Sequence, residues 1–166
     1  MRTHTTSRVA VALVLAAGMT SVAVGAGAAA AAKTPNPCKL LKASEIATEF
    51  DGAVVSEPEP GLKTAASSSC TWDVAAGATL PDGSVTSTLM FIGGKPAYDG
   101  LKQNADFVPV AGLKNSLYQQ KTGALLVLDG ANLVTVQGIF REGLPPKSHD
   151  VQEHLVALVK IATKRS

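Results

Sequence analysis

Two cysteines, Cys38 and Cys70, constrain the fold most, because the segment before them is typical of an export signal. Arg2 and Arg8 precede an uncharged stretch, Val9–Ala32, that ends in small residues. Disulfides form and persist in oxidising compartments outside the cytoplasm. The sequence therefore predicts one disulfide that closes a loop of 31 residues. Two buried free thiols are the alternative, and no Cys-x-x-Cys spacing supports a redox pair.

Residues 1–32 are predicted to be a signal peptide that is cleaved after Ala28, Ala30 or Ala32. The uncharged stretch is also long enough to span a bilayer as an uncleaved anchor. More than half of it is alanine and glycine, which favours cleavage. Lipid attachment to Cys38 is not expected, because Pro37 directly before it has a fixed φ and no N–H.

Charge and length argue for one compact domain without a nucleic-acid partner. Cleavage after Ala32 removes 32 of 166 residues and leaves 134, and it takes two of the 15 basic residues away from a chain with 13 acidic ones. The remaining chain is near neutral, which does not suggest a polyanion as partner. We expect residues 33–37 to be a linker and residues 38–166 to be a single domain.

Apolar residues at helical spacing predict three helices. The first is expected within residues 38–50, and the second within residues 93–105 with Pro96 near its start. The third is expected from Asp150, because Asp150 and Glu153 stand at capping-box spacing. Its apolar stripe would consist of Val151, Leu155, Leu158, Val159 and Ala162.

Strand-forming residues predict two hairpins. Residues 70–75 would pair with residues 85–92, and residues 125–128 would pair with residues 133–140 around an Asp-Gly-Ala-Asn turn. A short strand is expected at residues 117–119.

The segment between the first helix and Cys70 is predicted to be mostly loop. Residues 51–69 would begin with a turn and a short strand and continue as a loop rich in Pro, Gly and Ser. The order of elements indicates the α+β class. We expect a mostly antiparallel sheet of about five strands, with helices packed on one face and one disulfide.

Three stretches carry a family resemblance: "PCKLLKASEIATEFDG", "CTW" and "VPVAGLKNSLYQ". With the final strand pair and helix, they resemble the actinobacterial exported domain-of-unknown-function family 3558, which includes secreted proteins and lipoproteins. The resemblance covers Pro37 to the C-terminal helix and implies export, the disulfide and the architecture, but no activity. Two positions differ: Lys42-Ala43 stands where relatives tend to have Thr-Pro, and Lys114-Asn115 stands where they tend to have Gly-Asp.

No catalytic or metal-binding pattern emerges, so neither an enzyme nor a cofactor is expected. His149 and His154 lie about 140° apart on a helix, so they cannot share an ion. Ser67–Ser69 lack a Gly-x-Ser-x-Gly elbow and are interpreted as a flexible loop. Paired carboxylates such as Glu57 and Glu59 are interpreted as a solvated, extended loop.

Trp72, the only tryptophan, lies two residues from Cys70 and is predicted to pack against the disulfide in the core. In the alternative, Trp72, Tyr98 and Tyr118 form an aromatic platform for an apolar or carbohydrate ligand.

We expect an exported, non-enzymatic domain that binds an envelope component or another exported protein. One alternative is a small secreted hydrolase that uses loop Ser and Asp residues. Another is a structural envelope protein tethered to the membrane, which requires an uncleaved leader.

Overall fold

The computed structural model describes residues 36–75, 81–141 and 149–166, all within the unit Lys33–Ser166. The predicted signal peptide and residues 33–35 of the predicted linker lie outside the described residues, and so do the side chains of His149 and Asp150. The elements in chain order are η1 (Pro37–Lys39), α1 (Ala43–Glu49), β1 (Glu59–Lys63), β2 (Ser67–Val74), β3 (Gly83–Met90), α2 (Gly94–Leu101), β4 (Phe107–Val108), β5 (Ser116–Gln119), β6 (Ala124–Asp129), β7 (Asn132–Phe140) and α3 (His149–Thr163). Among the described helices, none combines the length and hydrophobicity needed to span a bilayer.

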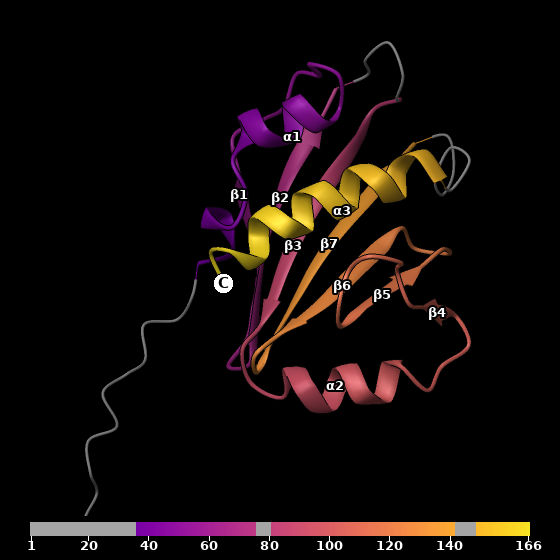
Figure 1. Cartoon of the computed structure of the whole chain (residues 1–166). Coiled ribbons are helices and arrows are strands. Elements are labelled where there is room, and N and C mark those ends of the chain that lie inside the picture. The colour runs from indigo at the N-terminus through magenta and orange to yellow at the C-terminus, as the bar shows by residue number, and fades with distance from the viewer. Residues whose placement is uncertain (1–35, 76–80, 142–148) are drawn as a thin grey trace, which may run out of the picture. The chain divides into compact units, whose positions relative to one another are not determined.

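The described strands form one antiparallel sheet in the order β1-β2-β3-β7-β6-β5-β4 (Figure 1). The predicted α+β class is confirmed, but the expected number of about five strands is wrong, because the sheet has seven. The prediction missed β1 and β4. All five residues of β1 are exposed, so no alternation marks it as a strand, and β4 is only two residues long.

Both predicted hairpins are confirmed. β2 pairs with β3 over its full length, and β6 pairs with β7 around the two-residue turn Gly130-Ala131. The short strand expected after the turn near residue 52 is reduced to a single bridge between Val55 and Val74.

The sheet carries helices on both faces, so the expectation that they pack on one face is wrong. η1, α1 and α3 cover the larger cluster of buried side chains, and α2 covers a smaller one. In Figure 1, α1 and α3 lie across the same side of the sheet, and α2 lies apart from them. On β6, Leu125 and Val127 point to the first cluster, whereas Leu126 and Leu128 point to the second. We call these two sides the α1/α3 face and the α2 face.

The apolar stripe predicted for the last helix is confirmed. Its five members have no solvent-exposed surface and lie in the cluster on the α1/α3 face: Val151, Leu155, Leu158, Val159 and Ala162. Burying such a stripe stabilises a helix more than its intrinsic propensity does. α3 therefore covers β6 and β7 on this face. Arg165, just after the C-terminal end of α3, contacts Glu45 at the start of α1.

Beyond the reach of α2, the α2 face is lined by hydroxyl groups. Ser69, Thr71, Thr86 and Thr88 alternate with the buried residues of β2 and β3 and are partly exposed. The hydroxyls of Thr71 and Thr86 lie 3.0 Å apart across the strand pair. One side of β2 and β3 therefore belongs to the core, and the other presents polar groups.

Candidate functional site

The disulfide between Cys38 and Cys70 is present and confirms the predicted pairing, with 5.1 Å between the two Cα atoms. It joins η1 to β2. The Asn36 carboxamide oxygen accepts the Cys38 N–H at 3.0 Å, and the buried Ser87 hydroxyl donates to the Pro37 carbonyl oxygen at 3.1 Å. The bond is consistent with an oxidising compartment, and these contacts hold η1 in one position over the sheet.

The two sulfur atoms differ in environment, and this difference protects the disulfide against reduction. Cys38 is half-buried, whereas Cys70 is fully buried in the large cluster. If a thiol attacked Cys38, the leaving thiolate of Cys70 would form inside the apolar core, where burial disfavours its charge. Reduction is therefore opposed by the packing around Cys70.

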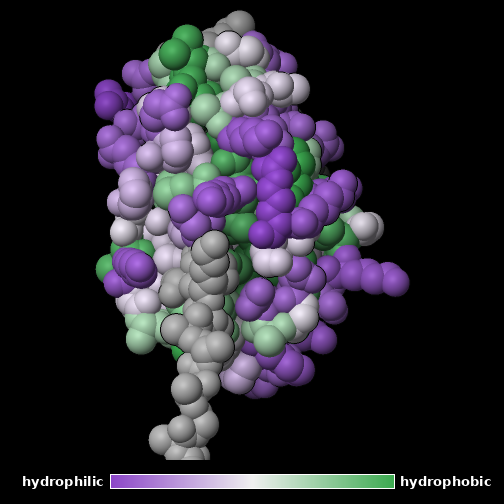
Figure 2. Space-filling model, turned by 90° about the vertical axis from the view of Figure 1, so that its left-hand side faces the viewer, coloured by the Kyte–Doolittle hydropathy of each residue, from purple (hydrophilic) through white to green (hydrophobic). Residues whose placement is uncertain are grey.

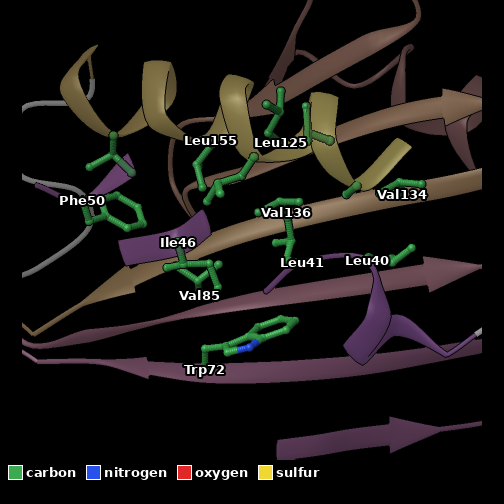
Figure 3. Close-up of a cluster of buried hydrophobic side chains, with 14 of the residues drawn as sticks. Leu40, Leu41, Ile46, Phe50, Trp72, Val85, Leu125, Val134, Val136 and Leu155 are labelled. Atoms are coloured by element: carbon green, nitrogen blue, oxygen red, sulfur yellow. The ribbon is translucent and has the colours of Figure 1, made fainter. Parts of the chain in front are cut away.

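Trp72 lies on β2 in the same buried cluster as both cysteines, with no exposed surface. Its indole N–H has no hydrogen-bond partner among the described residues. In Figure 3 the indole nitrogen lies on the side of the ring that faces away from Ile46 and toward the edge strand β1. A buried donor of this kind costs free energy when it is left unpaired, so the surroundings of this nitrogen need an explanation.

The aromatic rings proposed as a platform do not come together. Tyr118 is fully buried on the α1/α3 face, as Trp72 is, whereas Tyr98 is buried in the smaller cluster beneath α2. The hydroxyl of Tyr118 also has no partner among the described residues, and burial raises the pKa of this phenol above its ordinary value. The three rings lie on two sides of the sheet and offer no shared surface.

Two adjacent cavities lie between the η1–α1 segment and residues 57–63, which include β1, and we call them together the disulfide groove. The first has a volume of about 320 Å³, and the residues around it include Pro37, Cys38, Pro60, Gly61, Lys63 and Ser69. The second has a volume of about 440 Å³, and the residues around it include Cys38, Leu41, Lys42, Glu57, Pro58 and Trp72. Cys38 borders both cavities. Figure 2, which views this side of the molecule, shows hydrophobic atoms set behind flanking hydrophilic ones. Volumes in this range are typical of small-ligand sites.

One wall of the groove, the start of α1, is fixed by an ion pair with the C-terminal segment. Arg165 donates two hydrogen bonds to the Glu45 carboxylate, at 2.8 and 2.6 Å, and one to the Leu40 carbonyl oxygen at 3.1 Å. The hydrogen bond from Arg165 lowers the pKa of Glu45 below its ordinary value. The same carboxylate accepts the Lys42 N–H at 2.8 Å. The Glu45 carboxylate therefore caps the first turn of α1.

The other wall is the edge strand β1, whose outer side is unsuited to pairing with another strand. Pro58 and Pro60 have no N–H, and the register shifts between Pro60 and Lys63. Proline, lysine and a bulge on an edge strand all oppose the addition of a further strand. An extended partner chain is therefore not expected to continue the sheet here.

The charged side chains of the groove form no salt bridge within the described part of the chain, although Lys42 interacts electrostatically with Glu45. Lys42 and Glu57 on the second cavity and Lys63 on the first are exposed, and none forms a salt bridge with another described residue. The groove thus combines cationic and anionic groups around a partly apolar floor. Both donors and acceptors are available to a bound molecule.

The serine and histidine residues considered for catalysis make contacts within the fold. Ser67–Ser69 belong to β2 and do not form the loop that the sequence suggested, because β1 pairs beside them. The Ser69 hydroxyl donates to the Leu62 carbonyl oxygen at 3.4 Å. The His154 ring lies 5.1 Å from the Phe50 ring. Within the described residues, no three His, Cys, Asp or Glu side chains lie close enough together to hold a metal ion.

Comparisons with protein-family models, with curated proteins and with solved structures give no match to this chain. The candidate site is therefore inferred from its geometry alone. Sequence reasoning found the disulfide and Trp72 but missed the groove, because β1 was interpreted as loop. The signal available in the sequence was Glu57-Pro58-Glu59-Pro60, an exposed stretch with prolines, which is also compatible with a protected edge strand.

Proposed function

We propose that this chain is an exported binding domain that engages an envelope component or another exported protein through the disulfide groove. The observation that carries this proposal is the unpartnered indole N–H of Trp72 beside a cavity of about 440 Å³. A donor that is left unpaired in the free protein becomes satisfied when a ligand supplies an acceptor. The export-like leader and the family resemblance, both from the sequence, support a location outside the cytoplasm.

The rigidity of the groove walls also supports a binding role. The disulfide fixes η1, and the Arg165–Glu45 pair fixes the start of α1. A site whose walls are already ordered loses little conformational entropy when a ligand binds, so more of the contact energy appears as affinity.

The proposal is tested by mapping where envelope material contacts the domain. The oxidised mature protein, labelled with ¹⁵N, is titrated with polysaccharide, lipid and protein fractions of a bacterial envelope. We expect one fraction to shift the amide resonances of the residues around the two cavities and to leave those of α2 unchanged. If no fraction shifts the groove resonances at high concentration, the proposed function is wrong.

A pair of variants on α1 provides the control. Ser44 is exposed and lines the second cavity, and Thr48 is exposed one turn further along the same helix. Ser44→Trp places a bulky side chain at the groove and should reduce binding at least tenfold, whereas Thr48→Trp should leave it unchanged. Equal losses in both variants would point to a general effect of the added ring.

A further inference from the structure

We propose that the ligand of the disulfide groove is a neutral, polyhydroxylated molecule, a short saccharide chain, with one of its oxygen atoms accepting the Trp72 indole N–H. This inference rests on the proposed binding function and specifies its ligand class. It is argued from the unpaired donor, from the charges around the groove and from the shape of the two cavities.

The indole N–H defines what the ligand must present at the floor of the groove. Tryptophan nitrogen is a donor only, so it needs an acceptor such as a hydroxyl, ring or amide oxygen. Because Trp72 has no exposed surface, a ligand reaches this nitrogen only when a neighbouring side chain moves. Lys42 lines the same cavity and its side chain is exposed, so we assign this movement to Lys42.

The charges around the groove favour a neutral ligand. Lys42 and Glu57 border the same cavity, so a carboxylate or phosphate attracted by the lysine would be repelled by the glutamate. A hydroxyl group avoids this conflict, because it donates to a carboxylate and accepts from an ammonium group. Lys63 on the first cavity extends the row of polar groups past Cys38.

The shape and edges of the groove argue against other ligand classes. Strand addition is opposed by Pro58 and Pro60, so an extended peptide loses the backbone pairing that gives such complexes their affinity. An acyl chain needs a continuous apolar lining, but charged and hydroxyl side chains line both cavities. Two cavities that share Cys38, with the partly exposed Pro58 ring beside polar side chains, suit the alternating polar and C–H surfaces of linked sugar rings.

The test uses the single tryptophan as its reporter. The oxidised mature protein is titrated with soluble, neutral β-linked oligomers of glucose and of N-acetylglucosamine, four units long. Parallel titrations use phosphatidylglycerol vesicles and a proline-rich decapeptide. We expect at least one oligosaccharide to shift the only indole N–H resonance in a saturable way, because the N–H gains an acceptor.

Variants with matched controls locate the contact. Lys42→Met and Glu57→Gln should each weaken oligosaccharide binding about 10- to 100-fold, the usual effect of losing one hydrogen bond to a charged group. Lys102→Met, directly after α2, and Glu153→Gln on α3 should leave binding unchanged. Trp72→Phe, followed by calorimetry, should weaken it about fivefold. If Trp72→Phe does not fold, the two exposed variants still decide the question.

The outcomes separate the ligand class from the proposed function. If vesicles or the peptide shift the groove resonances and the sugars do not, the saccharide inference is wrong and the binding function stands. If neither these probes nor the envelope fractions shift them, both are wrong. The saccharide inference is also wrong if only water contacts the indole N–H, or if sugars bind equally well to Lys42→Met and Glu57→Gln.

Discussion

The two faces of the sheet are held together in different ways. On the α1/α3 face, the N-terminal elements η1 and α1 share one large cluster with α3, which is distant from them in sequence. A disulfide and a buried serine contact reinforce this cluster. On the α2 face, one helix of eight residues covers a small cluster, and the remaining surface of β2 and β3 carries hydroxyls.

Because of this difference, the proposed binding site lies at the more strongly reinforced of the two faces. The disulfide groove lies at the margin of the α1/α3 face, where the chain is cross-linked and tightly packed. It contains Trp72 with a buried, unpartnered nitrogen, a costly feature that a well-packed surrounding can hold in place. The α2 face has no comparable reinforcement among the described residues.

The largest predicted effect compares two neighbouring leucines on β6. Leu125 is fully buried on the α1/α3 face, and Leu126 is buried in the small cluster on the α2 face. Leu125→Ala should lower the free energy of unfolding by about 4 kcal/mol and Leu126→Ala by about 2 kcal/mol, because a large core collapses less readily around a cavity. Urea unfolding of both variants measures the difference. Equal losses in the two variants would mean that the two clusters contribute equally to the free energy of unfolding.

The next effect concerns the disulfide. Replacing both Cys38 and Cys70 by alanine should lower the free energy of unfolding by about 3–4 kcal/mol, since the closed loop spans 32 positions. Chemical denaturation of the double variant measures the loss. Amide exchange should increase in η1 and α1 and stay unchanged in α2, because only the α1/α3 face is tied by this bond. Uniformly faster exchange would contradict this localisation.

Much of the α1/α3 face could be predicted from the sequence, because its signals are periodic. The stripe of α3 recurs at helical spacing, and the strands of both hairpins are bounded by turn residues, so local physics specifies them. From the sequence we did not predict that a helix covers the second face of the sheet, although Leu125 to Leu128 form an unbroken apolar run. Such a run is typical of a strand that is buried on both sides.

The site was predictable only in part, because it depends on contacts between distant segments. Cys38, Cys70 and Trp72 could be singled out from their spacing and residue type. The groove needs β1 beside η1, and β1 carries no alternation that reveals it. The environment of the indole nitrogen depends on the tertiary packing around Trp72, which no local pattern encodes. The Arg165–Glu45 pair joins residues 120 positions apart, so spacing could not reveal it.

The ion pair between Arg165 and Glu45 predicts a dependence of stability on pH. The hydrogen bond from Arg165 lowers the pKa of Glu45 in the folded state, so its stabilising effect is present above the unfolded-state value, near 4.5. It is lost as the pH falls through the lower folded-state value. Glu45→Gln should therefore destabilise the protein at pH 7, by less than loss of the disulfide.

Unfolding curves at several pH values measure this effect. The difference between wild type and Glu45→Gln should shrink as the pH is lowered below about 4.5. Glu49→Gln, at the other end of α1, removes no ion pair formed with the described residues and serves as the control. A difference that is independent of pH would show that the ion pair does not stabilise α1.

The smallest effect tests whether the α1/α3 face truly contains unpaired polar groups. The buried Tyr118 hydroxyl has no partner within residues 36–75, 81–141 and 151–166, whereas the hydroxyl of Tyr98, on the α2 face, is not among the buried groups that lack one there. Removing an unpaired hydroxyl also removes its desolvation cost, so Tyr118→Phe should be neutral or should stabilise the protein by up to about 1 kcal/mol. Tyr98→Phe should be neutral or destabilise it by up to about 1 kcal/mol. A clear loss of stability in Tyr118→Phe would mean that a water molecule satisfies this hydroxyl, and the same explanation would then have to be considered for the indole N–H of Trp72.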